Sequence, residues 1–259
     1  MSEAGGQSKS KTDLTMEYEM NHKRRGLALI FNHEHFQFFC ERRGTKIDRD
    51  NLKQRFQALG FEVNIHDNKN KTEVLEEIFK AAEMDHADAD CFVCVFLTHG
   101  KEGQISAWDD MINIKEITDP FRDQCKSLVG KPKIFIFQAC AGKKYEDAVT
   151  GMVGRFTDDT KEVLPYIYTI PAGADFLMCY SVEGFYSLHD IKSGTFYIHD
   201  LCEMLEQHGS TLEFTELLTL VNLKVSRRDA KIGFGKMPKK QMLCFTSMLT
   251  KKLYFRCNK

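Results

Sequence analysis

Short apolar runs, repeated along the chain, constrain its fold more than any other feature. Five of them have the length of buried strands and are bounded by turn-forming residues: they lie at 27–31, 61–65, 91–97, 134–137 and 176–180. Helix-spaced apolar residues occur at 72–84, 201–207 and 212–225, and Asp48 is interpreted as the cap of another helix that runs to Leu59. This alternation predicts an α/β fold with a mostly parallel, doubly wound sheet.

Composition and charge exclude several classes of protein. The hydrophobic share of 42% and the charged share of 28% are those of a folded globular chain. With 36 Lys and Arg against 37 Asp and Glu, the net charge of −1 disfavours dedicated nucleic-acid binding. No apolar run approaches the roughly 18 residues that span a bilayer, so no membrane association is expected.

The cysteines and the N-terminal residues indicate where the protein works. The nine cysteines are unevenly spaced, and several lie inside apolar runs, which is typical of a reduced interior rather than of a disulfide framework. The N-terminus lacks the apolar core of a secretory signal. We expect a cytoplasmic location, with the nucleus as a second compartment.

Two polar segments interrupt the periodic pattern. The first 22 or so residues are rich in Ser, Lys and Gly and predict a mobile tail, with order beginning near Arg25. Residues 142–165 have weak periodicity and predict a long loop or linker, which inside a compact domain is usually functional or disordered.

A cysteine and a histidine each follow a predicted buried strand. Cys140 comes just after the run at 134–137, and His99, followed by Gly100, comes just after the run at 91–97. The carboxyl ends of parallel strands are where α/β folds assemble their sites, so the two side chains can face each other. A thiol is only slightly ionised at neutral pH, and a neighbouring imidazole activates it. Cys140 and His99 are the candidate nucleophile and base.

The segment around the cysteine resembles a known signature. Gln138-Ala139-Cys140-Ala141-Gly142 matches the QAC-x-G string of caspases, whose histidine lies about 50 residues upstream; here the separation is 41 residues (140 − 99). Longer strings carry the likeness to executioner caspases over roughly residues 20–256: HADADCFVCVFLTHG, LVGKPKIFIFQAC, PAGADFLMCYSV, LEFTELLTLVNLKVS and SMLTKKLYF.

The resemblance implies a fold, a domain plan and an activity. The fold would be the caspase-hemoglobinase fold, a six-stranded sheet flanked by helices. A short prodomain (1–22), a large-subunit segment (23–141), a cleavable linker (142–165) and a small-subunit segment (166–259) would follow one another. The activity would be cysteine endopeptidase cleavage of protein substrates after aspartate, in a homodimer or a pair with another caspase. Gly100 and the backbone N–H of Cys140 would form the oxyanion hole.

The pocket for the substrate aspartate departs from the family pattern. Caspases hold this carboxylate with two arginines and a glutamine; Arg42 and Gln138 match two of these, but His189 stands where the second arginine is expected. Histidine offers one donor and is mostly neutral at pH 7, so the pocket should be weaker. Ala141 stands where the family has an arginine directly after the nucleophile, and Phe196 stands where a tryptophan is expected. The resemblance assigns the pocket to Arg42, Gln138, Tyr186, Ser187, Leu188, His189 and Phe196.

The expected processing sites also depart from the pattern. Val163 stands where the aspartate of the linker cleavage site is expected, which leaves Asp158 and Asp159 as candidates. Near the N-terminus, Asp13 ends a segment similar to a short-prodomain cleavage site.

No cofactor and no metal are predicted. Cys91 and Cys94 have a metal-type spacing but lie in an apolar strand without a second pair, so they are interpreted as core thiols.

Two alternatives to an active protease stay open. The first is a caspase-fold pseudoenzyme or modulator that dimerises with an active caspase, favoured by His189 and Ala141. The second is a plain α/β binding module, which would leave the Cys-His pair unexplained.

Overall fold

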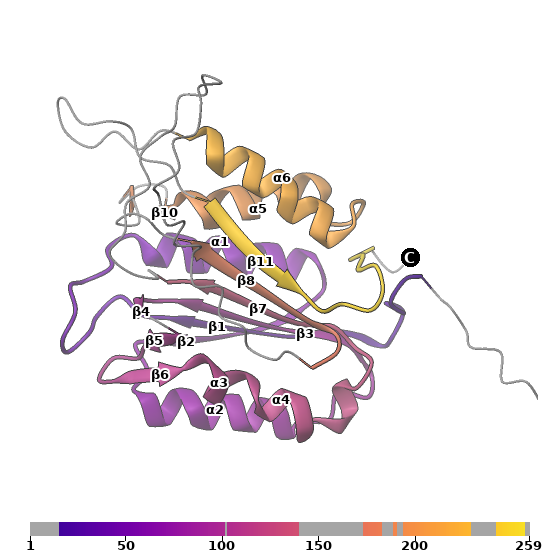
Figure 1. Cartoon of the computed structure of the whole chain (residues 1–259), viewed down its shortest axis with the longest axis horizontal. Coiled ribbons are helices and arrows are strands. Elements are labelled where there is room, and N and C mark those ends of the chain that lie inside the picture. Colours follow the sequence, from indigo (N-terminus) through magenta and orange to yellow (C-terminus); the bar gives the residue numbers. More distant parts are fainter. Residues whose placement is uncertain are drawn as a thin grey trace, which may run out of the picture.

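A six-stranded sheet forms the centre of the computed structural model, which describes residues 16–101, 103–139, 173–182, 189–190, 194–228 and 242–256. The strand order is β11-β8-β7-β3-β1-β2 (Figure 1). All neighbouring strands are parallel except β11, which is antiparallel to β8. This confirms the predicted mostly parallel sheet. The strands are β1 (Arg24–Asn32), β2 (Glu62–Asp67), β3 (Ala89–Leu97), β7 (Lys133–Gln138), β8 (Phe176–Val182) and β11 (Met242–Ser247).

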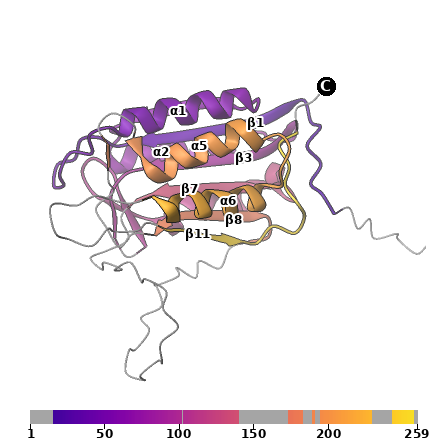
Figure 2. The ribbon, with the colours of Figure 1, turned by 90° about the horizontal axis from the view of Figure 1, so that it is seen from above.

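Helices cover both faces of the sheet and create two hydrophobic cores. One face carries α1 (Thr45–Ala58), α5 (Phe196–His208) and α6 (Phe214–Arg227), which lie side by side in Figure 2. The opposite face carries α2 (Lys71–Glu83), α3 (Ile114–Thr118) and α4 (Pro120–Asp123), followed by a 3₁₀ turn (Lys126–Leu128). Every residue of strand β3, near the middle of the sheet, is buried, which explains the unbroken apolar run at 91–97. Within the described residues, no helix is both long and apolar enough to cross a membrane.

Two small sheets extend the loops at the ends of these strands and were not anticipated. Strands β4 (Gly100–Lys101), β5 (Gln104–Ser106) and β6 (Met111–Asn113) form an antiparallel sheet directly after His99. Strands β9 (His189–Asp190) and β10 (Gly194–Thr195) pair antiparallel directly before α5. Strands of two or three residues carry no readable alternation, so a sequence pattern cannot reveal them.

The prediction that Asp48 caps a helix is wrong. Helix α1 begins at Thr45, with Gly44 in the capping position, and Asp48 lies inside its first turns. The Asp48 side chain is fully buried and accepts a hydrogen bond from the Thr195 backbone N–H at 2.8 Å. A partner so distant in sequence leaves no local signal.

Ordered structure begins earlier than expected near Arg25. Tyr18 is buried, and its hydroxyl donates to Asp175 at 2.6 Å and accepts the backbone N–H of Thr250 at 2.8 Å. Its own backbone N–H donates to the carbonyl of Lys252. This contact with the C-terminal segment orders the residues that precede β1.

Candidate active site

His99 lies at the carboxyl end of β3, where its backbone is held on both sides. The preceding Thr98 donates its N–H to the carbonyl of Gln138, the last residue of β7, at 3.0 Å. The carbonyl of His99 accepts the N–H of Ser106 at 2.8 Å, and Gly100 opens β4. The histidine is therefore fixed between the central sheet and the small β4–β6 sheet, at the sheet edge where the sequence placed it.

The His99 ring packs into a loop formed by residues 36–40. Its Nε2 lies 2.9 Å from the carbonyl oxygen of Cys40 and 3.9 Å from the Cys40 thiol. The rings of Phe36 and Phe39 lie 4.7 and 5.5 Å from the imidazole, measured between centroids. Burial lowers the pKa of His99, which outweighs the opposing effect of the Cys40 carbonyl. The imidazole is therefore neutral at physiological pH, the form that can accept a proton.

The proposed nucleophile Cys140 lies outside the described residues, but the strand register shows where its chain comes from. Leu97 of β3 pairs with Gln138 of β7, so these parallel strands end side by side. His99 follows Leu97 by two positions, and Cys140 follows Gln138 by two positions. Two residues of extended chain reach at most about 7 Å, so the backbones that carry the two side chains start from neighbouring points of one sheet edge.

Arg42 and Gln138 are buried polar side chains near the same end of the sheet. Arg42 is 1% exposed, and its Nη1 donates to Thr45 Oγ1 at 3.0 Å, while the Thr45 hydroxyl donates to Asn32 at 2.7 Å. The amide of Gln138 is fully buried, and neither its nitrogen nor its oxygen has a hydrogen-bond partner among the described residues. A buried amide without partners is costly unless another group completes it. A bound carboxylate would supply an acceptor for the Gln138 N–H.

The other predicted pocket residues are placed in part. Tyr186, Ser187 and Leu188 lie outside the described residues. His189 opens β9, where its backbone pairs with Thr195 of β10. Phe196 is the first residue of α5, and the Arg228 guanidinium lies over its ring at 5.0 Å from the centroid.

The processing candidates are not placed. Asp13, Asp158, Asp159 and Val163 lie outside the described residues, as does the whole linker at 142–165. The predicted boundaries of the subunit segments therefore stay predictions.

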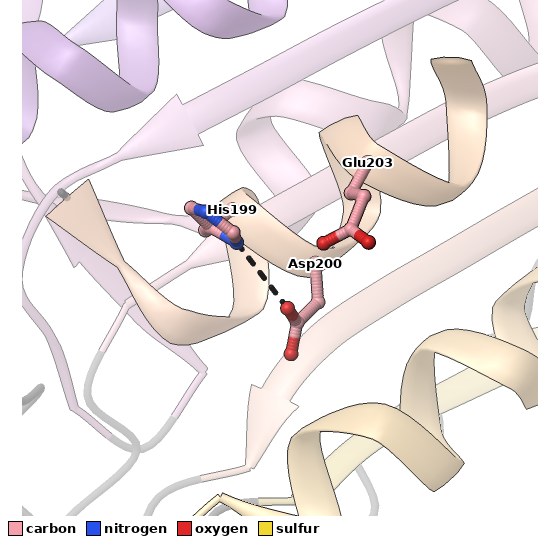
Figure 3. A group of neighbouring side chains, drawn as sticks. All are labelled: His199, Asp200 and Glu203. Carbon is pink, nitrogen blue, oxygen red and sulfur yellow. Dashed lines mark hydrogen bonds and ion pairs between the residues drawn. The ribbon is translucent and has the colours of Figure 1, made fainter. Parts of the chain in front are cut away.

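One group of side chains on α5 has the composition of a metal site. His199, Asp200 and Glu203 offer ligand atoms that lie within 4.8 Å of one another (Figure 3). Their negative charge is already matched, because Arg228 binds the buried Asp200 carboxylate through Nε at 2.8 Å and Nη2, and Lys224 pairs with Glu203. The group is explained as an ion-pair network that joins α5 to the end of α6.

Sequence analysis missed the residues that surround His99. Cys40, Phe36 and Phe39 belong to a loop between β1 and α1, where no periodicity links them to a histidine about 60 positions later. The run of three aromatic residues within four positions, followed by a cysteine, was the available signal.

Comparison with known proteins agrees with this architecture. The caspase domain family matches residues 25–254. Caspase-6 of Gallus gallus is 52% identical over 258 residues, covering 94% of this chain and 84% of the relative. Caspase-6 of Mus musculus is 52% identical over 272 residues, covering 98% of each chain. The crystal structure of caspase-1 from Spodoptera frugiperda matches with a TM-score of 0.83 at 36% identity, covering 95% of each chain. The chain belongs to the caspase family of cysteine endopeptidases.

Proposed function

We propose that this cysteine endopeptidase cuts protein substrates after aspartate in an executioner-type role, with Cys140 as nucleophile and His99 as acid and base. The register between β3 and β7 supports this assignment most directly, since it brings the chain segments that carry the two residues to one sheet edge. The neutral form of His99 at physiological pH supports its role as the base.

The reaction would proceed through an acyl-enzyme. His99 takes the proton of the Cys140 thiol, and the sulfur attacks the backbone carbonyl carbon of the substrate aspartate. Gly100 and the Cys140 backbone offer N–H groups to the oxyanion that develops there. The C–N bond then breaks, and the leaving amine receives the proton from His99. A water molecule, deprotonated by His99, hydrolyses the thioester and releases the new carboxyl terminus.

The specificity pocket would combine Arg42, Gln138 and His189. A buried guanidinium supplies the permanent positive charge that a desolvated carboxylate needs, and the Gln138 amide supplies a further donor. His189 adds a single donor, with charge only when it is protonated. Tyr186, Ser187, Leu188 and Phe196 would form the remaining walls.

Activation and assembly complete the proposal. Strand β11 lies at the end of the described sheet, so its outer edge can pair with a second copy of this chain or with another caspase. Cleavage after Asp13 would remove the prodomain, and cleavage after Asp158 or Asp159 would separate the subunit segments, in a protein of the cytoplasm and nucleus. Because Val163 replaces the usual aspartate, self-processing should be slow; rapid cutting of the linker, seen by electrophoresis, would contradict this.

The alternative of a caspase-fold modulator without activity is not favoured, because the chain is 52% identical in sequence to two caspase-6 proteins. A plain binding module would leave unexplained why His99 and Cys140 both follow strands whose ends lie side by side.

An aspartyl peptide with an irreversible electrophile tests the assignment. Intact-mass measurement should show one adduct per chain, and peptide mapping should place it on Cys140. Cys140→Ala should abolish both the adduct and the cleavage of an aspartyl peptide, whereas His99→Ala should abolish turnover with the fold preserved by circular dichroism. An adduct without turnover would support the modulator, and undiminished cleavage by Cys140→Ala would overturn the assignment of the nucleophile.

A further inference from the structure

Asp48 is a buried carboxylate that is hydrogen-bonded to a distant part of the chain. Its side chain is fully buried in α1, and Oδ1 accepts the backbone N–H of Thr195 in β10 at 2.8 Å. The other oxygen, Oδ2, has no hydrogen-bond partner among the described residues. Burying a carboxylate with half of its acceptor capacity unused is costly, so this position calls for a reason beyond helix formation.

The neighbouring Gly194 shows how closely the carboxylate approaches the β10 backbone. A Cβ atom built on Gly194 would lie 2.1 Å from Asp48 Oδ1, and the glycine has a φ of +78°, which L-residues rarely adopt. Carboxylate and glycine therefore fit each other, and a shift of either one would displace the other.

The held backbone carries two of the proposed pocket residues. Thr195 pairs with His189 across the β9–β10 hairpin, and it directly precedes Phe196 at the start of α5. The Thr195 hydroxyl in turn accepts the N–H of Ile198 and caps this helix. The place of the hairpin and of the first turn of α5 thus depends on where Asp48 holds the Thr195 N–H.

Only an acceptor at Oδ1 is needed for this bond. Burial raises the pKa of Asp48 to about 7, while the Thr195 N–H, the charge of Arg42 and the Thr195 side chain act in the opposite direction. The bond does not depend on this ionisation, because Oδ1 can accept the N–H whether or not the carboxyl is protonated.

We propose that Asp48 is a positioning residue for the substrate pocket, which sets the place of the β9–β10 hairpin and of Phe196 through the Thr195 N–H. This inference rests on the proposed function, because the roles of His189 and Phe196 in binding substrate belong to that proposal. Asp48 itself does not touch the substrate.

Steady-state kinetics on one aspartyl peptide separate positioning from general stability. Asp48→Ala should raise KM at least about 10-fold and change kcat less than about 3-fold, because the loosened hairpin impairs substrate binding rather than the Cys-His chemistry. Asp48→Asn keeps an acceptor at the same place and should stay within about 3-fold of the wild type in both constants. Asp90→Ala is the matched control, since Asp90 is equally buried but binds Arg25 at the opposite end of β3; it should lower stability without raising KM.

Hydrogen exchange tests the contact without requiring any activity. In peptides that cover residues 189–198, the Thr195 amide should exchange at least about 10-fold faster in Asp48→Ala than in the wild type or Asp48→Asn. If the wild type does not cleave the peptide, the proposed function fails, while the exchange rates still decide whether Asp48 holds the hairpin. Should Asp48→Ala fail to fold, Gly194→Ala disturbs the same contact from the other side and should raise KM likewise.

Three results would overturn the inference. The first is an unchanged KM in a folded Asp48→Ala or Gly194→Ala protein. The second is unchanged exchange of the Thr195 amide in Asp48→Ala. The third is an Asp48→Asn protein as impaired as Asp48→Ala, which would mean that the charge, and not the acceptor, matters.

Discussion

Acid should destabilise this protein partly through His33, at the carboxyl end of β1. The residue is fully buried, its backbone N–H donates to the Leu97 carbonyl at 2.9 Å, and its ring Nε2–H donates to the carbonyl of Lys69 at 2.9 Å. Its other ring nitrogen, Nδ1, has no partner among the described residues. Burial lowers the pKa of His33 from 6.5 to about 4, because a protonated ring would be desolvated there and would face the charge of Arg42.

The sign and size of the effect follow from proton linkage. Near pH 5 the unfolded chain protonates His33, since its pKa there is 6.5, whereas the folded protein with a pKa of about 4 keeps it neutral. The unfolded state binds more protons, so stability that is present above pH 6.5 is lost as the pH falls toward 4. Between neutral pH and pH 5 this residue alone should remove about 2 kcal/mol.

Urea unfolding at about pH 7.5 and pH 5 measures this contribution. His33→Gln keeps a donor toward the Lys69 carbonyl and cannot titrate, so its free energy of unfolding relative to the wild type should rise by about 2 kcal/mol on acidification. His35→Gln, two positions along and 55% exposed in its side chain, is the control and should show no comparable change. The same difference at both pH values for His33→Gln would refute the reasoning.

Three further predictions follow from separate features. Among the described cysteines Cys40 is the exposed one, so in a Cys140→Ala background iodoacetamide should label it at least about 10-fold faster than the buried thiols, and Cys40→Ser should lose this label. Gly26→Ala should cost more than about 3 kcal/mol in urea unfolding, because its Cβ would lie 1.8 Å from the Cys91 carbonyl oxygen; a mild effect would contradict the register of β1 and β3. His189→Arg should raise kcat/KM on an aspartyl peptide by about 30-fold or more near pH 7.5 and by less near pH 6, and an equal gain at both pH values would remove His189 from the pocket.

The parallel strands were predictable because strands buried on both faces consist almost entirely of apolar residues. Strand β3 is covered on both faces, so its residues from Cys91 to Leu97 are all apolar, and the same holds for Ile134–Phe137 in β7. Strand β11 was missed because it lies at the sheet edge, where Cys244 and Thr246 are only partly buried and the apolar pattern is broken.

In the candidate site, too, only the residues with a local sequence signal could be predicted. His99 could be placed because it follows a readable strand, and the register of β3 and β7 sets the ends of the two strands side by side. The position of Cys140, beyond the end of β7, stays a prediction. The contact between Cys40 and His99 could not be predicted, since it depends on how a loop folds back over the sheet. Asp48 was misinterpreted for a related reason: an aspartate near the start of a helical pattern favours a cap, while the partner that determines its role is Thr195, in another part of the chain.

The pairing of β7 with β8 has a consequence for how the protein can be built. These two strands flank residues 140–172 in sequence, yet they pair in parallel from Lys133 with Phe176 to Phe137 with Tyr180. Both hydrophobic cores also mix residues from before and after that gap. The two parts are therefore held together by strand pairing and apolar packing rather than by the connecting chain. Two separately expressed polypeptides, divided within the linker, should associate during refolding into one domain. Such a split protein would report when its two fragments meet.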